Sequence, residues 1–458
     1  MITSINPSTA SAIFEYALHT PEQLEQKLSK ASQTQKAWAQ QDLQSRASKL
    51  KKVSAVLREK KPYYATLITQ EMGKPIAEAE AEIEKCAWNC DFYADMATTY
   101  LGDETVESNA SVSKVVYEPL GLVLAIMPWN YPFWQVLRFA APALAAGNGI
   151  VLKHANNVPQ CALAIEELFL LAGLPEGLVA TVLVAHSAVP QLIEDPRTSA
   201  LTLTGSTPVG KMVAAQAGAV LKKQVLELGG ADAFIVLADA DLTLATKTAV
   251  KARFQNTGQS CIAAKRFIVV DSIAEAFVHE FCAQVAKLTV GDPMLRTTEQ
   301  GPMARENLRA ELHTQVQKTV AQGAKLLMGG EPLPGAGYFY APTVLDGVTS
   351  AMVAGHEELF GPVAVIMRVA DAEAAIALAN SLDYGLGAAI WSKDVAQAER
   401  YARRIEAGAV FVNGLVASDP RYPFGGIKQS GYGRELGVHG AREFTNIKTV
   451  WIGPARQV

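Results

Sequence analysis

The sequence has few cysteines, and they follow no spacing pattern: Cys86, Cys90, Cys161, Cys261 and Cys282. An odd, scattered set does not build a disulfide scaffold and is typical of a reducing compartment such as the cytosol. Cys86 and Cys90 would share one helix face, but no second Cys or His pair at zinc spacing accompanies them, so we expect no metal site. The chain also opens without a basic segment followed by an apolar one, which predicts no secretory signal.

Long apolar runs and an excess of one charge sign are also missing. The longest apolar runs, such as 121–127, are far shorter than the ~20 residues that span a bilayer. A net charge of −4 leaves no basic surface for nucleic acid or anionic lipid. Of the 458 residues, 49% are hydrophobic and 19% charged, which is typical of a globular protein of two or three domains. We therefore expect a cytoplasmic protein that binds neither nucleic acid nor membrane.

Helical spacing dominates the first hundred residues, and strands and helices alternate afterwards. The first series predicts strands at 111–117, 122–127, 150–153, 179–184 and 200–203, with helices at 133–146, 158–172, 187–194 and from 207. The second series, after residue 230, predicts helices at 242–253, 274–287, 304–322, 372–382 and 395–406, with strands near 266–270, 338–344, 363–368 and 386–391. A last alternating strand is expected at 444–452. This rhythm predicts doubly wound parallel sheets, in which ligands bind at the carboxyl ends of the strands.

Cys261 lies on a polar turn between an amphipathic helix pattern and the buried strand pattern at 266–270. A thiol in such a place either packs as a small apolar side chain or faces a cleft as a nucleophile. Two other polar side chains also end apolar runs, Glu227 within 225–230 and Asn130 within 128–132. Taken singly, Glu227 fits a carboxylate that faces solvent, and Asn130 fits a turn residue.

Together these three side chains are the parts of a covalent thioester mechanism. The thiol of Cys261 would attack a carbonyl carbon. The amide of Asn130 and the backbone N–H of Cys261 would stabilise the resulting oxyanion. Glu227, its pKa raised by an apolar setting, would then activate a water molecule to hydrolyse the acyl thioester.

Seven ordered segments, covering nearly the whole chain, resemble the aldehyde dehydrogenase superfamily: 71–75, 128–132, 204–206, 227–230, 254–261, 358–362 and 423–426. The resemblance implies an α/β fold with two doubly wound parallel-sheet domains and a small bridging β element that joins subunits. The implied divisions are a dinucleotide-binding domain at 1–100 and 120–228, a catalytic domain at 229–430, and a bridging element at 101–119 and 431–458. A homodimer or homotetramer follows from this arrangement.

A dinucleotide cofactor is implied by the resemblance rather than by the usual glycine fingerprint, which no strand-to-helix turn contains. The segment 204–210 follows a strand and opens a helix whose N-terminus could bind a pyrophosphate, although simple helix capping explains it as well. Family members that are strict for NAD tend to have Glu where this chain has Asn156, so NAD and NADP both remain open. The implied cofactor-binding residues are Trp129, Lys153, Asn156, Gly205, Ser206, Gly210, Leu228, Gly229, Glu358 and Phe360.

Arg138 lies about two helical turns after Asn130 in an otherwise apolar helix, where an arginine is costly unless it is paired. An internal salt bridge would satisfy it. A similarity to bacterial succinate-semialdehyde dehydrogenases implies instead that Arg138 binds a substrate carboxylate, which a guanidinium does bidentately. Those enzymes often carry a second arginine where this chain has Gln255, and the resemblance therefore places Gln255 among the expected substrate-binding residues. Ser418 and Arg421 are the expected substitutes, with Trp134 lining the same pocket.

The sequence therefore predicts NAD(P)-dependent oxidation of a short aldehyde to its acid, with succinate semialdehyde as the first candidate. The alternative is the same chemistry on a neutral aliphatic or aromatic aldehyde, with Arg138 only structural. An acylating reaction with coenzyme A is disfavoured by Glu227, which suits water as the second nucleophile. A catalytically silent binding homologue is disfavoured because Cys261, Glu227 and Asn130 are all present.

Overall fold

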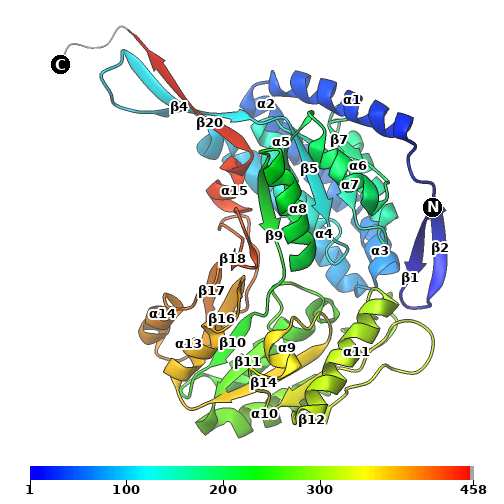
Figure 1. Ribbon diagram of the computed structural model, residues 1–458, viewed down its shortest axis with the longest axis vertical. Helices are drawn as coiled ribbons and strands as arrows, with labels where there is room; N and C mark the ends of the chain where they lie inside the picture. The colour runs from blue at the N-terminus through cyan, green and yellow to red at the C-terminus, as the bar shows by residue number, and fades with distance from the viewer. Residues whose placement is uncertain (454–458) are drawn as a thin grey trace.

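The computed structural model describes residues 1–453, and two open sheets organise it (Figure 1). The first sheet contains β5 (Leu122–Met127), β6 (Gly149–His154), β7 (Val179–Thr181), β8 (Thr198–Thr204), β9 (Lys223–Glu227) and β19 (Gly431–Tyr432). Its strand order is β19-β9-β8-β5-β6-β7, and only β19, at the edge, is antiparallel to its neighbour. The doubly wound α/β architecture that the strand and helix rhythm predicts is confirmed.

Helices cover both faces of this first sheet. One face carries α1 (Pro21–Ala39), α7 (Val189–Glu194) and α8 (Thr207–Ala219). The other carries α2 (Leu43–Glu59), α3 (Lys61–Met72), α4 (Ile76–Leu101), α5 (Trp134–Ala146) and α6 (Pro159–Leu171). Strand β5 carries apolar side chains on both faces, so both faces must be buried. Leu122 and Leu124 pack in one apolar core, whereas Val123 and Ala125 pack in the other.

The second sheet repeats this plan in the other half of the molecule. Its order is β12-β13-β14-β11-β10-β16-β17, with only the edge strand β12 antiparallel. The strands are β10 (Ala233–Val236), β11 (Arg266–Val270), β12 (Lys325–Met328), β13 (Thr343–Asp346), β14 (Val363–Val369), β16 (Gly387–Trp391) and β17 (Ala409–Val412). One face packs against α9 (Leu242–Phe254) and α10 (Asp271–Val285), and the other against α11 (Glu306–Ala321), α13 (Ala372–Asn380) and α14 (Val395–Ala402).

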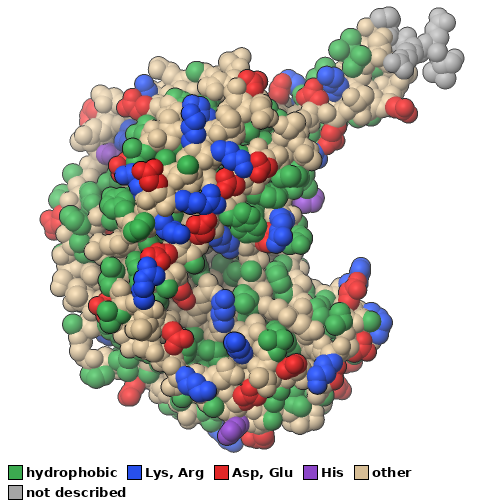
Figure 2. Space-filling view, turned by 180° about the vertical axis from the view of Figure 1, so that it is seen from behind, with side chains coloured by type: hydrophobic (Ala, Val, Ile, Leu, Met, Phe, Trp, Pro, Cys, Tyr) green, Lys and Arg blue, Asp and Glu red, His purple; other side chains and the backbone are tan. Residues whose placement is uncertain are grey.

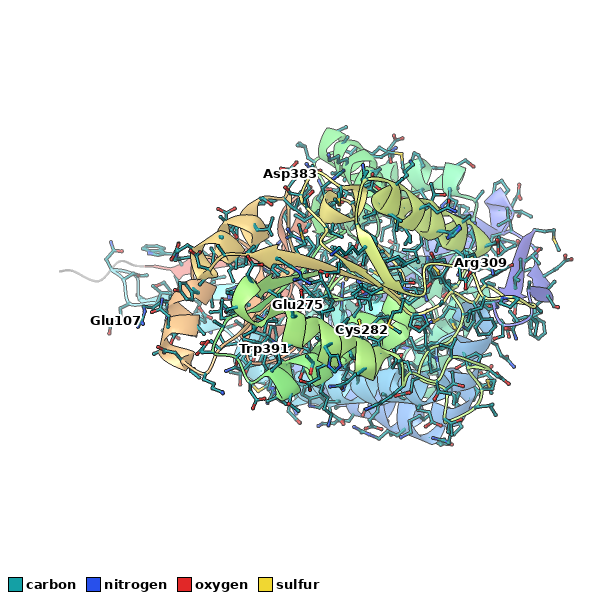
Figure 3. The ribbon with its side chains drawn as sticks, turned by 90° about the horizontal axis from the view of Figure 1, so that it is seen from below. Glu107, Glu275, Cys282, Arg309, Asp383 and Trp391 are labelled. Carbon is teal, nitrogen blue, oxygen red and sulfur yellow. The ribbon has the colours of Figure 1, made fainter. Side chains whose placement is uncertain are left out.

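A third, antiparallel sheet forms an arm that projects from the body (Figures 1 and 2). It consists of β3 (Glu104–Thr105), β4 (Val112–Pro119) and β20 (Thr445–Ile452), in the order β20-β4-β3. Strands β4 and β20 pair along their whole length, as the alternating patterns at 111–117 and 444–452 suggest. In the view from below, Glu107 lies near the end of the arm, far from Cys282 and Arg309 on the second half (Figure 3).

The remaining elements are short. They are β1 (Ile2–Asn6), β2 (Ser11–Tyr16), α12 (Val353–His356), β15 (Tyr384–Gly385), β18 (Ile427–Lys428), α15 (Gly437–Glu443) and the 3-10 turns η1 (His186–Ala188) and η2 (Gln255–Gly258). The strand expected near 338–344 lies later, at β13, and Tyr340 before it pairs with Pro332 as an isolated bridge. Within residues 1–453, no helix is long and apolar enough to cross a membrane. Acidic and basic side chains are interspersed over the face seen in Figure 2.

Candidate active site

Cys261 follows a tight left-handed turn at the end of α9. Asn256, Thr257 and Gly258 in η2 have φ angles of 55°, 54° and 70°. Such angles are costly for a β-branched residue such as threonine. At position 258 a Cβ atom would also lie 2.3 Å from the carbonyl oxygen of Gly361, so glycine is required there.

Buried hydrogen bonds hold this turn in place. The guanidinium of Arg253 has no exposed surface and donates to the carbonyl oxygens of Gly258 at 2.8 Å and Ala264 at 3.2 Å. The side-chain amide of Asn256 donates to the carbonyl oxygen of Asn130 at 2.9 Å. Because these contacts determine the unusual backbone, the nearby thiol is held in one position.

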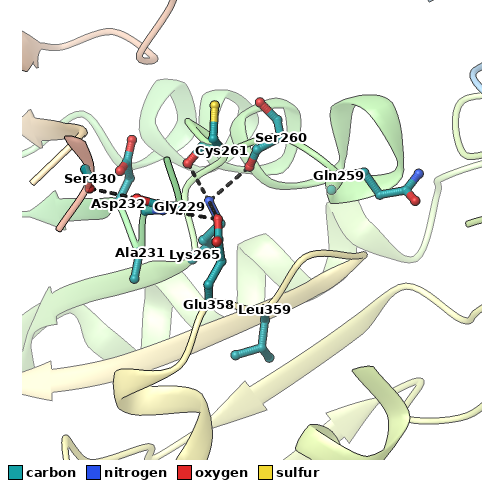
Figure 4. A network of polar contacts seen from close by, with 12 residues as sticks. Gly229, Ala231, Asp232, Gln259, Ser260, Cys261, Lys265, Glu358, Leu359 and Ser430 are labelled. Atoms are coloured by element: carbon teal, nitrogen blue, oxygen red, sulfur yellow. Dashed lines mark hydrogen bonds and ion pairs between the residues drawn. The ribbon is translucent and has the colours of Figure 1, made fainter. Parts of the chain in front are cut away.

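Lys265 joins the cysteine loop to the second half of the molecule (Figure 4). Its buried ammonium donates to the carbonyl oxygens of Ser260, at 2.9 Å, and Cys261, at 2.5 Å, and lies 3.1 Å from the carboxylate of Glu358. The N–H of Gly230 donates to the same carboxylate at 3.2 Å. Figure 4 shows the Cys261 sulfur pointing away from Lys265, so the tether leaves the thiol free.

Two cavities meet at the partly exposed Cys261, which lines both of them. The larger has a volume of about 770 Å³ and the smaller about 360 Å³. A thiol shared by two cavities can contact a molecule in each. Among the described residues, no group of three or more His, Cys, Asp or Glu side chains could hold a metal ion.

The larger cavity contains most of the residues expected to bind a dinucleotide: Trp129, Gly205, Ser206, Leu228, Gly229, Glu358 and Phe360. The rings of Trp129 and Phe360 meet edge to face, with centroids 5.8 Å apart. Helix α8 begins at this cavity, and the side chain of its N-cap, Ser206, makes no capping hydrogen bond. Its first-turn N–H groups are therefore available to an anion such as a pyrophosphate. A Cβ at Gly229 would lie 2.5 Å from the carboxylate of Glu358, so glycine lets this carboxylate approach the backbone closely.

Three other expected cofactor residues do not line this cavity. The buried ammonium of Lys153 donates to the side-chain oxygen of Asn156 at 2.9 Å and to the carbonyl oxygen of His154 at 3.0 Å. Burial lowers the pKa of Lys153 to about 8. Gly210 packs against Leu228, where a Cβ would lie 2.4 Å from a methyl group, so it brings α8 close to the cavity wall.

Asn130 and the backbone of Cys261 supply donors beside the thiol. Asn130 is buried and lines the larger cavity, and its amide donates to the carbonyl oxygen of Gln259 at 3.1 Å. A side-chain amide has two N–H groups, so one remains for a ligand. The N–H of Cys261 donates to no residue within 1–453. Burial raises the pKa of the Cys261 thiol to about 12, with Lys265 acting in the opposite direction.

Glu227 lies behind the cavities and lines neither of them. Its carboxylate is buried, and neither oxygen has a hydrogen-bond partner among the described residues. Burial raises the pKa of this carboxyl, and the guanidinium of Arg138 partly offsets that effect. An unpaired buried carboxylate is costly, which is typical of a group kept for chemistry rather than for stability.

Arg138 is already paired inside the protein. Its Nε forms an ion pair with Glu435, and its Nη2 donates to the hydroxyl of Thr204 at 3.2 Å. The guanidinium also lies over the ring of Phe424, 4.9 Å from its centroid. Arg138 nevertheless lines the smaller cavity, and its Nη1 has no hydrogen-bond partner among the described residues. The internal salt bridge and a ligand contact are thus compatible.

Three of the other expected substrate residues also line the smaller cavity: Trp134, Gln255 and Ser418. Arg421 does not. Its guanidinium is 58% exposed and lies 2.6 Å from the carboxylate of Asp419. The guanidinium of Arg421, which the sequence suggested as a partner for the substrate, is therefore already paired with the nearby Asp419.

Three polar residues near the cavities have no motif that marks them in the sequence. Lys85 lines the smaller cavity from α4, Lys265 tethers the cysteine loop, and Glu435 pairs with Arg138. Lys85 follows Glu82 and Glu84 on a helix, a pattern that usually belongs to a solvated face. Glu435 lies in a glycine-rich loop, where a carboxylate is ordinarily exposed.

Comparison with known proteins identifies relatives that match this chain over nearly its whole length. A relative from Synechocystis sp., named a probable NADP(+)-dependent succinate-semialdehyde dehydrogenase, is 50% identical over 98% of this chain and 99% of its own length. An Escherichia coli K12 relative, named a succinate semialdehyde dehydrogenase using NAD(P)+, is 49% identical over 98% of this chain and 97% of its own.

Solved structures agree with these sequence matches. A succinic semialdehyde dehydrogenase from Streptococcus pyogenes, solved in complex with NADP+, superposes with a TM-score of 0.97 at 37% identity. The superposition covers 99% of this chain and 100% of that one. The family model described as the aldehyde dehydrogenase family matches residues 1–450. The chain therefore belongs to the aldehyde dehydrogenase family.

Proposed function

We propose that this enzyme oxidises succinate semialdehyde to succinate with NAD or NADP. The observation that carries the proposal is the position of Cys261, which lines a cavity suited to a dinucleotide and a second, smaller cavity whose lining includes Lys85 and Arg138 as well as Glu78 and Glu82. Relatives about 50% identical over nearly the whole chain are named for this reaction, which supports the choice of substrate.

The residues divide the reaction between them. The Cys261 thiol releases its proton to solvent as its sulfur attacks the aldehyde carbon, and the amide of Asn130 and the N–H of Cys261 stabilise the oxyanion. The bound nicotinamide supplies an acceptor for the hydride that leaves this carbon. The acyl group then remains on Cys261 as a thioester. Glu227 removes a proton from water as the water attacks the thioester, which releases the acid and restores the thiol.

The residues present fit a dinucleotide. The N-terminus of α8 and the close approach at Gly229 provide an anion site and room for a flat ring. Trp129, Phe360 and Glu358 would contact the remaining parts of the dinucleotide. Lys153 and Asn156 would contact its adenosine ribose. Asn156 carries no charge, so nothing at this position repels the 2′-phosphate of NADP.

The test is a panel of aldehydes with and without a terminal carboxylate, each measured with NAD and with NADP. We expect kcat/KM for succinate semialdehyde to exceed that for butanal by at least tenfold. A preference for butanal would favour the second candidate, oxidation of a neutral aldehyde. That candidate is supported by one observation: the Arg138 guanidinium already has Glu435 as its counter-ion.

We further propose that the two sheets correspond to the cofactor and catalytic domains, and that the arm joins subunits into a homodimer or homotetramer. The arm supports this because apolar side chains of β20 are exposed on it. We also propose that the enzyme works in the cytoplasm, since its five cysteines are all free.

A further inference from the structure

Lys85, near the middle of α4, places an ammonium group in the wall of the smaller cavity. Its Nζ donates to the hydroxyl of Ser418 at 2.8 Å and lies 4.2 Å from the ring centroid of Trp134. We propose that Lys85, together with Ser418, binds the distal carboxylate of the substrate and so selects ω-carboxy aldehydes. This inference rests on the proposed aldehyde oxidation and names its recognition element.

The charge of Lys85 has no counter-ion within the described residues. Two carboxylates raise its pKa by their charge, those of Asp419 and Glu82, and each is already paired, Asp419 with Arg421 and Glu82 with Lys74. Burial lowers the pKa of Lys85 to about 8, as expected of an ammonium that lacks compensation. A substrate carboxylate would supply the missing negative charge.

Ser418 is oriented to assist. Its oxygen accepts a hydrogen bond from Lys85 and a second one from the indole N–H of Trp134 at 3.1 Å. A serine hydroxyl has two acceptor sites and one donor. With both acceptor sites occupied, the O–H is left to donate, and the residue lines the cavity. An ammonium and a hydroxyl donor therefore lie side by side in the wall of this cavity.

Arg138 and Lys85 then have different tasks. Arg138 carries a positive charge that Glu435 already balances, whereas the positive charge of Lys85 is unbalanced until a ligand arrives. Cys261 lines the same cavity of about 360 Å³, so one short molecule can reach the thiol with its aldehyde while its carboxylate meets Lys85. Discrimination between a carboxylate and a methyl end group then depends mainly on Lys85.

The first test compares Lys85→Met and Lys85→Arg with the parent enzyme, using succinate semialdehyde and butanal. We expect Lys85→Met to lose roughly 30-fold or more in kcat/KM for succinate semialdehyde, mostly through KM, and less than about threefold for butanal. Lys85→Arg should recover at least part of the loss. Lys251→Met is the control, because Lys251 is exposed at the edge of the same cavity.

A loss of the same size for both aldehydes, or an equal loss in Lys251→Met, would overturn the assignment. The second test measures succinate binding by calorimetry, which does not depend on turnover. We expect Lys85→Met to weaken succinate binding about tenfold or more. If the parent enzyme binds succinate through Lys85 but does not oxidise succinate semialdehyde, the proposed function fails and the carboxylate site remains. Unchanged succinate binding in Lys85→Met rejects the site itself.

Discussion

At the scale of single residues, the proposed mechanism has Cys261 and Glu227 act in different steps, so their variants are expected to fail differently. Cys261→Ala removes the nucleophile, and we expect no dehydrogenation although the cofactor still binds. Glu227→Gln keeps the thiol but loses the base for water, so the first turnover should still release a burst of reduced cofactor. Steady-state turnover should then fall by roughly 100-fold or more. Rapid mixing distinguishes the two; a Glu227→Gln variant without any burst would mean that Glu227 acts before the hydride leaves.

The pH dependence of turnover follows from the same carboxyl. Burial raises the pKa of Glu227, so a smaller fraction is ionised at neutral pH than for an exposed glutamate. The ionised form is the base, and its fraction grows as the pH rises through the raised pKa. We therefore expect kcat to increase from pH 6 to pH 9, by at most about tenfold per unit. Glu227→Gln should flatten the profile of the steady-state rate, and an equally steep profile in that variant would assign the ionisation to another group.

We propose that cofactor choice depends on the neutral side chain of Asn156. It accepts a hydrogen bond from Lys153 at 2.9 Å, in the position where a carboxylate would repel a 2′-phosphate. We expect Asn156→Glu to lower kcat/KM with NADP by roughly tenfold or more, which corresponds to about 1.4 kcal/mol. The value with NAD should stay the same or improve. Asn157→Glu adds the same charge one position later and is the control. An equal loss of NADP activity in Asn157→Glu would mean that the added negative charge, and not its position, causes the loss.

At the scale of elements, much of the architecture follows from the sequence. Continuous apolar runs such as Leu122–Met127 predict strands that are covered on both faces, and β5 has this property. The two-residue alternation at 444–452 predicts an exposed strand, and β20 pairs with β4 as an arm. The antiparallel edge strand β12 is not visible in the sequence, because its short segment is mostly exposed and carries no alternation.

The positions of the candidate site residues were predictable where a local motif marks the end of a helix or strand, and not where distant loops meet. Local sequence patterns place Cys261, Asn130 and the α8 N-terminus at such ends, and the family resemblance supplies their expected roles. The left-handed turn at Asn256 and Thr257 does not, because asparagine tolerates this conformation but a β-branched threonine disfavours it, and it is hydrogen bonding by the buried Arg253 that holds the turn. In the same way, pairing partners such as Glu435 come from segments hundreds of residues away, which no local pattern reveals.

The ion pair between Arg138 on α5 and Glu435 joins two such distant segments. Removing one partner leaves a buried charge, so we expect Arg138→Leu to lower the free energy of unfolding by about 3–5 kcal/mol. Arg138→Leu combined with Glu435→Gln removes both charges and should recover much of that stability. Thermal and urea unfolding report the difference. If the double variant is no more stable than Arg138→Leu, the loss comes from packing against Phe424 instead of the charge.

At the scale of the whole molecule, the arm of a single protomer leaves apolar surface exposed. Ile447 and Trp451 lie on the same face of β20 and are 62% and 51% exposed. Strand β20 is also the edge of its three-stranded sheet, and no strand within residues 1–453 pairs with its outer side. Exposed apolar side chains beside a free strand edge are typical of a subunit interface.

We therefore expect charged residues on this face to separate the subunits. Ile447→Lys combined with Trp451→Lys should convert the parent oligomer into a monomer, measured by light scattering, with the circular dichroism spectrum retained. The reason is that burying two ammonium groups without partners against an apolar surface costs several kcal/mol. Leu221→Lys is the matched control, because Leu221 is 94% exposed but lies on the body after α8. An unchanged molar mass in the double variant, or a parent enzyme that is already monomeric, would show that the arm does not hold subunits together.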